Sequence, residues 1–116
     1  AYVDLGLRTN SGNTYRLKML LKDFPYSKPE VYVVFPVQLR DSDGKSLSSY
    51  SVSAAMHLLT PDSNGNIQLC HFSSKVWHTN VTLYKVALKC LIWLNAYEGH
   101  LRTGKPIDHF LKHQPL

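Results

Sequence analysis

The strongest constraint on the fold is a run of apolar residues near the C-terminus that recur at steps of three and four. They are Leu83, Val86, Ala87, Cys90, Leu91, Leu94, Tyr97 and Leu101. Residues spaced in this way share one face of an α-helix, so the run predicts an amphipathic helix of about five turns. Asn80 or Thr82 is suited to cap the start of this helix. Gly104 and Pro106 are suited to end it.

Sequence that favours strands precedes this helix. Residues 2–8 and 14–21 alternate apolar and polar side chains, and the turn cluster at residues 10–13 joins them, so a hairpin is predicted. The β-branched and aromatic run at residues 31–35 predicts a third strand, which completes an antiparallel meander. Residues 51–59 fit either a short helix or an extended segment, and both interpretations stay open.

Residues 62–77 place a cysteine between a short strand and a Ser-rich loop. Ile67 and Leu69 are the apolar pair of this fourth strand and are expected to be buried. Gln68 and Cys70 alternate with that pair and are expected to point outward. The stretch therefore predicts a thiol that another molecule can reach.

Length and composition indicate a single domain over residues 1–116. No run approaches the roughly 18 to 20 apolar residues of a membrane span, and no signal-peptide pattern opens the chain. Two cysteines do not form a disulfide framework, which favours a reducing cytoplasm. The strands followed by one long helix predict an α+β fold in which a small antiparallel sheet packs against that helix.

The net charge of +5 is concentrated in the second part of the chain. Residues 71–116 contain six Lys or Arg and two acidic residues, whereas residues 1–70 contain seven and six. The basic residues are scattered, without an Arg-rich run or an aromatic ladder. A solvated surface is therefore favoured over a nucleic-acid interface, and an acidic protein partner is the next alternative.

Taken in order, these segments resemble the ubiquitin-conjugating-enzyme (UBC) fold, and more closely its bacterial relatives. Residues 23–31, DFPYSKPEV, match the family's turn of aspartate, aromatic residue and proline. His57 falls where the family carries its His-Pro-Asn motif, and Trp77 follows the cysteine at the expected interval. The implied fold is a UBC-like four-stranded antiparallel meander packed against a long C-terminal helix, with the N-terminal helix missing or truncated.

Residues 93–105, WLNAYEGHLRTGK, are similar to the ending of bacterial conjugating-enzyme-like proteins of anti-phage operons, including the cyclic-oligonucleotide (CBASS) systems. The resemblance implies a cytoplasmic transferase that carries a partner's C-terminal acyl group as a Cys70 thioester and passes it to an amine. The implied partner is a protein with a C-terminal glycine, either a nucleotide cyclase or a ubiquitin-like protein. An activating enzyme is a further partner that the resemblance allows. No cofactor, metal or membrane is implied.

The chain departs from the family pattern around the motif and the cysteine. Leu58 and Leu59 stand where Pro-Asn is expected, so the asparagine that stabilises the oxyanion is not in its usual place. Cys70 lies about two residues later than in eukaryotic members, and Gln68 occupies the expected position. A shift of two keeps Cys70 on the same strand face.

Thioester chemistry needs a thiolate, a base for the incoming amine and a donor for the oxyanion. Six residues are the candidates: Cys70, His57, His71, His78, Asn80 and Gln68. Cys70 is the predicted nucleophile, and each histidine is a possible base or a structural residue. His71 follows Cys70 directly, so a regular strand would point it to the opposite face. Asn80 and Gln68 are the candidate oxyanion donors.

Several alternatives compete with this prediction. Cys90 lies on the apolar helix face and is predicted to be a core residue. A zinc site built from Cys70, His71, His78 and Cys90 matches no recognised ligand spacing and is disfavoured. Three tail residues could fold back over the site, namely Asp108, His109 and His113. The rival functions are a non-catalytic protein-binding module of the same fold (UBC/RWD type), in which Cys70 is incidental, and a nucleic-acid binder.

Overall fold

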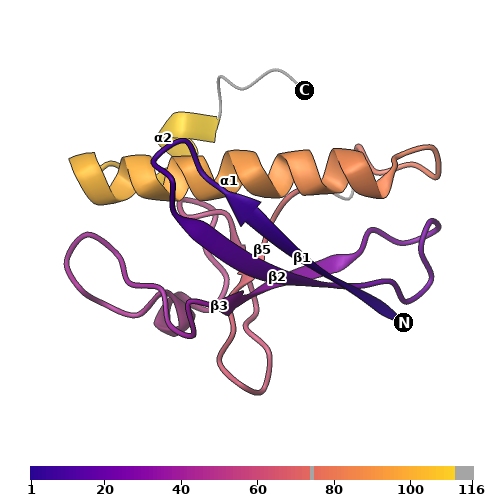
Figure 1. Ribbon diagram of the computed structural model, residues 1–116, viewed down its shortest axis with the longest axis horizontal. Coiled ribbons are helices and arrows are strands. Elements are labelled where there is room, and N and C mark those ends of the chain that lie inside the picture. Colours follow the sequence, from indigo (N-terminus) through magenta and orange to yellow (C-terminus); the bar gives the residue numbers. More distant parts are fainter. Residues whose placement is uncertain (74, 112–116) are drawn as a thin grey trace.

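The computed structural model describes residues 1–73 and 75–111. It has an α+β fold in which an antiparallel sheet is followed by a long helix that lies across it (Figure 1). The strands are β1 (Tyr2–Arg8), β2 (Thr14–Leu20), β3 (Glu30–Phe35), β4 (Leu58–Leu59) and β5 (Gln68–Leu69). The helices are the 3-10 turn η1 (Leu47–Tyr50), α1 (Leu83–Thr103) and α2 (Ile107–Leu111).

The sheet has five strands in the order β1-β2-β3-β5-β4. The predicted meander is confirmed for β1, β2 and β3, whereas the predicted number of four strands is wrong. The fifth strand is β4, which comes from the segment 51–59 whose structure the sequence did not decide. Because β4 has two residues, it is too short to show alternation. It pairs with the far side of β5, so strand order departs from chain order at this end of the sheet.

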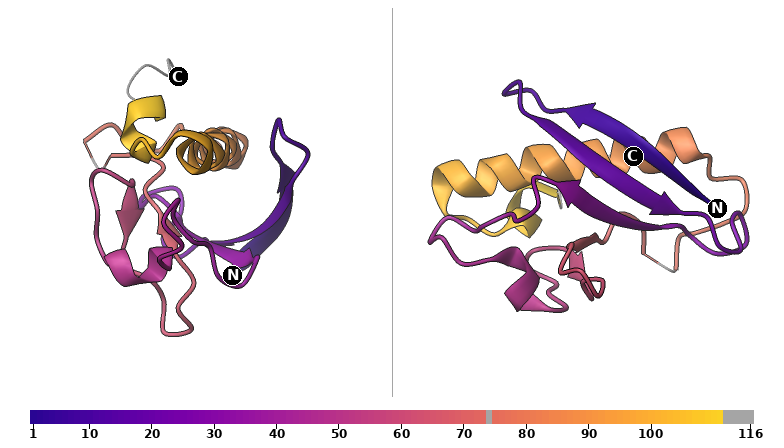
Figure 2. Two further views of the ribbon diagram at one scale, coloured as in Figure 1. Left: turned by 90° about the vertical axis from the view of Figure 1, so that its left-hand side faces the viewer. Right: turned by 60° about the horizontal axis from the view of Figure 1, so that its bottom comes forward.

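The β1–β2 hairpin and α1 enclose the core. The hairpin register runs from Tyr2 opposite Leu20 to Arg8 opposite Thr14. Alternate residues of β2 face the helix and are buried, namely Tyr15, Leu17 and Met19. Seen along α1, the sheet curves around the helix (Figure 2). The alternation predicted for residues 14–21 is thus confirmed in β2.

The ends of α1 follow the capping rules. Thr82, rather than Asn80, caps the helix, and its hydroxyl oxygen accepts a hydrogen bond from the Lys85 N–H at 3.1 Å. Gly104 ends the helix with a φ of 77°, and its N–H donates to the His100 carbonyl at 2.7 Å. A positive φ suits glycine because glycine has no Cβ. Within the described part of the chain, no helix is long and apolar enough to span a membrane.

Helix α2 folds back onto α1 beside Gly99. A Cβ built on Gly99 would lie 3.0 Å from the Phe110 ring, so the two helices approach closely only because this position lacks a side chain. Ile107, the first residue of α2, is fully buried. The Asp108 N–H donates to the Ala55 carbonyl at 2.9 Å, which ties α2 to the turn before β4.

Candidate functional site at Cys70

The register of two short strands brings a thiol and an imidazole together. β4 and β5 pair Leu58 with Leu69 in antiparallel order. One step further, Cys70 lies opposite His57, and the Cys70 N–H donates to the His57 carbonyl at 3.0 Å. Side chains at opposite positions of antiparallel strands point to the same face and interact. This register explains why residues 13 positions apart in the chain are neighbours, and it gives the predicted candidate His57 a place beside the thiol.

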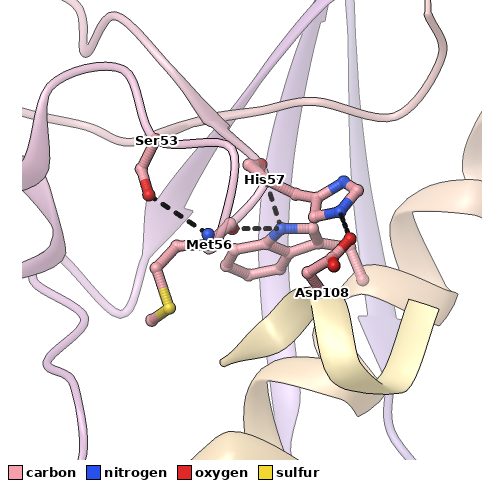
Figure 3. Close-up of polar contacts among 5 residues, drawn as sticks. Ser53, Met56, His57 and Asp108 are labelled. Carbon is pink, nitrogen blue, oxygen red and sulfur yellow. Dashed lines mark hydrogen bonds and ion pairs between the residues drawn. The ribbon is translucent and has the colours of Figure 1, made fainter. Parts of the chain in front are cut away.

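The side chain of Trp93 on α1 holds the backbone of His57 in place. His57 has a φ of 50°, a left-handed conformation that non-glycine residues seldom adopt. The Trp93 indole N–H donates to the carbonyls of Met56 and His57, each at 3.2 Å. The Met56 N–H in turn donates to the Ser53 hydroxyl at 3.1 Å, and Figure 3 shows these contacts around the turn. The surrounding contacts therefore maintain a strained residue at the site, a pattern that often accompanies function.

A carboxylate orients the imidazole from its other side. The His57 Nε2 lies 2.7 Å from the Asp108 Oδ1, and Figure 3 shows the ring directed at that carboxylate at the start of α2. The side chains of His57 and Asp108 are 28% and 47% exposed. With Nε2 engaged by Asp108, Nδ1 is the ring nitrogen left for the thiol. Cys70, His57 and Asp108 thus form a chain of thiol, imidazole and carboxylate.

The hydrogen bond between Cys70 and His57 favours the ionised form of both groups. It lowers the pKa of the Cys70 thiol, against the opposing effect of burial, and the positive charge of Lys28 lowers it further. The same hydrogen bond raises the pKa of His57, burial opposes this, and Asp108 adds to the rise. The arrangement therefore favours a thiolate next to an imidazolium.

Lys28 is a site residue that sequence reasoning did not select. Its ammonium donates to the Phe72 carbonyl at 2.6 Å, which holds it over the loop that follows Cys70. Lys28 belongs to the segment 23–31 that carried the family resemblance. A cation within that segment is the signal that could have pointed to it, since thiolates are stabilised by nearby positive charge.

Cys70 is half-buried and lies between two clefts. The first cleft has a volume of about 330 Å³ and is lined by Val52, Ser53, Ala54, His57, Leu58, Leu59, Cys70 and Asp108. The second has a volume of about 130 Å³ and is lined by His57, Cys70, His71, Lys89, Ile92, Trp93 and Leu111. The thiol, the imidazole and one side of the carboxylate are thus accessible from a mainly apolar cleft.

His71 and Gln68 are buried rather than presented to solvent. The His71 Nε2 lies 2.7 Å from the Pro29 carbonyl, and burial lowers the pKa of His71 to about 4. This keeps the ring neutral and makes its Nε2–H the donor. The expected outward orientation of Gln68 is wrong: it is 8% exposed, and its amide oxygen accepts from the Tyr32 hydroxyl at 3.4 Å. The reason is that β5 lies between β3 and β4, and the side chain of Tyr32, opposite Gln68 on β3, contacts it.

His78 and Asn80 are both exposed and contact each other. The Asn80 N–H donates to the His78 Nδ1 at 3.3 Å. Neither residue lines either of the two clefts at Cys70. Their predicted roles as base and oxyanion donor therefore stay predictions.

The remaining candidates separate clearly. Of the tail residues, Asp108 reaches the site, His109 packs edge-on against the Phe110 ring at 5.0 Å, and His113 lies outside the described residues. Cys90 is fully buried, as predicted, and burial raises the pKa of its thiol to about 12. Over residues 1–73 and 75–111, no group of three or more His, Cys, Asp or Glu is placed to hold a metal ion.

The arrangement is suited to acyl transfer through sulfur. An activated thiol attacks a carbonyl, an imidazole moves the protons, and a carboxylate keeps the imidazole oriented. Comparisons with models of protein families, with curated proteins and with solved structures found no match. The function therefore has to be inferred from the site itself.

Proposed function

We propose that this protein is a UBC-like acyl transferase that carries its substrate as a thioester on Cys70. The observation that carries the proposal is the half-buried Cys70 thiol, which lines the same clefts as His57, while the His57 Nε2 lies 2.7 Å from the Asp108 carboxylate. The α+β arrangement of an antiparallel sheet with a long C-terminal helix is compatible with the resemblance described above. The carried acyl group is the C-terminal carbonyl of a partner protein.

In the first step, the Cys70 thiolate attacks the activated carbonyl of the partner's C-terminal residue. The thiol proton passes to His57 and from there to the leaving group, which departs as a free thiol, or to solvent when AMP departs as an anion. His57 is therefore neutral again before the second step. Exchange of one thioester for another is nearly balanced in free energy, so a reachable thiolate is the main requirement. The ammonium of Lys28 stabilises negative charge near the sulfur.

In the second step, an amine attacks the Cys70 thioester and displaces the thiolate. A free lysine amine has a pKa near 10.4 and is therefore about 99.9% protonated at pH 7. His57 is placed to accept the proton that the attacking amine loses, and Asp108 stabilises the resulting imidazolium. The pair thus supplies the base that amine transfer needs.

The departure at Leu58 and Leu59 gains a function in this proposal. Both side chains line the apolar cleft beside Cys70, where the family motif would place Pro-Asn. The cleft accordingly receives the apolar part of the partner protein's C-terminal segment. A hydrogen-bond donor other than asparagine stabilises the oxyanion. The sequence resemblance is the basis for proposing that the partner protein is a nucleotide cyclase or a ubiquitin-like protein in bacterial anti-phage defence.

A second candidate function is favoured by the contact of His57 with Asp108. A nucleophile, a histidine and a carboxylate in series also occur in hydrolases, where water takes the place of the amine. Such an enzyme would cleave a peptide or thioester at the partner's C-terminus. The two functions share the Cys70 intermediate and differ in what attacks it.

A small thioester tests the proposal directly. The purified chain is mixed with N-acetylglycine mercaptoethanesulfonate thioester, which mimics a C-terminal glycine, and intact mass is followed with and without added ethylamine. We expect a reductant-sensitive adduct on Cys70 and, with ethylamine, more N-acetylglycine ethylamide than free N-acetylglycine. An excess of the free acid would favour the hydrolase.

Two cysteine variants are the matched controls. Cys70→Ser should form no adduct or a reductant-resistant ester, whereas Cys90→Ala should behave as the unmodified chain. The absence of an adduct in every case would contradict the transferase and leave the binding module as the better description.

A further inference from the structure

Lys89 shares a small cleft with the reactive thiol. It lies on α1, one position before the buried Cys90, and its side chain lines the cleft of about 130 Å³ together with Cys70 and His57. Its ammonium sits 5.0 Å from the centre of the Phe72 ring, a cation–π distance. An amine and the Cys70 thiol therefore line the same small cleft.

Lys89 has an amine that no carboxylate of the described residues engages, so it can act as a nucleophile in this cleft. Among the residues that the structure describes, the one ion pair joins His57 and Asp108, so Lys89 has no carboxylate partner there. Lys28, the other cation near the thiol, is held by its 2.6 Å hydrogen bond to the Phe72 carbonyl. Burial, and then the charge of Lys85, lower the pKa of Lys89, which increases the fraction of neutral amine.

Building on the proposed function, we propose that Lys89 is the first acceptor of the acyl group on Cys70, so that the chain modifies itself. The Lys89 Nζ lone pair attacks the thioester carbonyl, and a C–N bond forms. The C–S bond breaks with its electron pair on Sγ, which regenerates the Cys70 thiolate. The proton lost by the nitrogen passes to His57, and the product is an amide on Lys89.

Proximity is the physical reason for this transfer. A reaction between two groups held in one cleft avoids the entropy cost of bringing a separate amine to the site. The conversion of a thioester to an amide is also downhill, so the acyl group stays on nitrogen once it has moved. The amide would then occupy the second cleft and leave the apolar cleft beside Leu58 and Leu59 open.

The experiment follows one adduct as it changes chemistry. The full chain is incubated with N-acetylglycine mercaptoethanesulfonate thioester without added amine, and aliquots are treated with hydroxylamine before intact and tandem mass spectrometry. We expect a hydroxylamine-labile adduct on Cys70 that converts with time to a resistant adduct mapped to Lys89. Lys89→Arg should keep the labile adduct and reduce the resistant one by about tenfold or more.

Lys85→Arg is the matched control, because Lys85 lies one turn earlier on α1 and lines neither cleft at Cys70. It should behave as the unmodified chain, and Cys70→Ala should give neither adduct. A labile Cys70 adduct that never becomes resistant, or that becomes resistant equally in Lys89→Arg, would overturn the inference and leave the proposed function intact. Failure to form the Cys70 adduct at all would overturn both.

Discussion

Cys70 and Cys90 lie in two regions of the molecule that treat the same side chain in opposite ways. Cys90 lies on the regular helix α1 and belongs to the core, where it is fully buried and burial raises the pKa of its thiol to about 12. Cys70 sits just after a two-residue strand, half-exposed, where a hydrogen bond with His57 lowers its pKa. Long regular elements bury one thiol, and short irregular ones present the other.

The difference shows that the reactive side chains lie in the irregular part of the fold. The β1–β2 hairpin and α1 are long regular elements whose buried side chains form most of the core. At the other end of the sheet, β4 and β5 have two residues each, His57 has a positive φ, and α2 supplies a carboxylate. The regular region holds this irregular region in place through the Trp93 indole.

The largest expected effect is the contrast in thiol reactivity. A pKa of about 12 for Cys90 and one below the ordinary 9.0 for Cys70 imply a thiolate fraction at pH 7 that differs by about a thousandfold or more. Iodoacetamide should therefore modify Cys70 alone in the folded protein and both thiols after unfolding in guanidinium. Peptide mapping measures the two rates, and equal labelling in the folded state would contradict the comparison.

The second effect concerns stability in acid and extends the comparison to His71. Burial lowers the pKa of His71 from 6.5 to about 4, so the unfolded chain takes up a proton at a higher pH than the folded one. The stabilisation is complete above pH 6.5, and about 3 kcal/mol of the free energy of unfolding is lost as the pH falls to about 4. Urea titrations should show a flatter pH dependence for His71→Gln, which keeps a donor for the Pro29 carbonyl. An unchanged pH dependence would contradict the burial of a neutral ring.

The third effect concerns the hydrogen bond that activates the exposed thiol. Without His57 the pKa of Cys70 should rise, so His57→Ala should lower the alkylation rate of Cys70 at pH 7 by about tenfold and move its pH profile upward. Asp108→Asn keeps the imidazole and should give a smaller change in the same direction. A His57→Ala profile that matches the unmodified chain would show that another group activates the thiol.

The smallest effect concerns the buried thiol. Cys90→Ala removes one buried atom and should lower the free energy of unfolding by about 1 to 2 kcal/mol through lost burial and a small cavity. The alkylation rate of Cys70 should not change. A loss of Cys70 reactivity in this variant would indicate that the two regions are coupled more tightly than their contacts suggest.

The regular region could be predicted from the sequence because its signals are local. Apolar spacing predicted α1, the turn cluster at residues 10–13 predicted the hairpin, and Gly104 marked the end of the helix. These features depend on residues within a few positions of each other. The buried place of Cys90 followed from the same spacing.

The site could be predicted only in part, because it depends on contacts between distant residues. Cys70 and His57 were named from the sequence, but their meeting depends on the pairing of β4 with β5, and a two-residue strand has no periodicity. Gln68 was expected outside because the sequence does not show that β5 is an inner strand. Asp108 joins the site through the docking of α2, which no local pattern of residues 107–111 predicts.

Helix α2 packs against α1 at Gly99, and this contact positions Asp108. Asp108 reaches His57 from a five-residue helix whose Phe110 ring fills the space where any side chain at position 99 would begin. A methyl group at that position would lie 3.0 Å from the Phe110 ring, so the ring would have to shift by a few tenths of an ångström, two residues from Asp108. We therefore expect a substitution at this buried position of α1, which touches none of the reacting atoms, to alter the acidity of the thiol through Asp108.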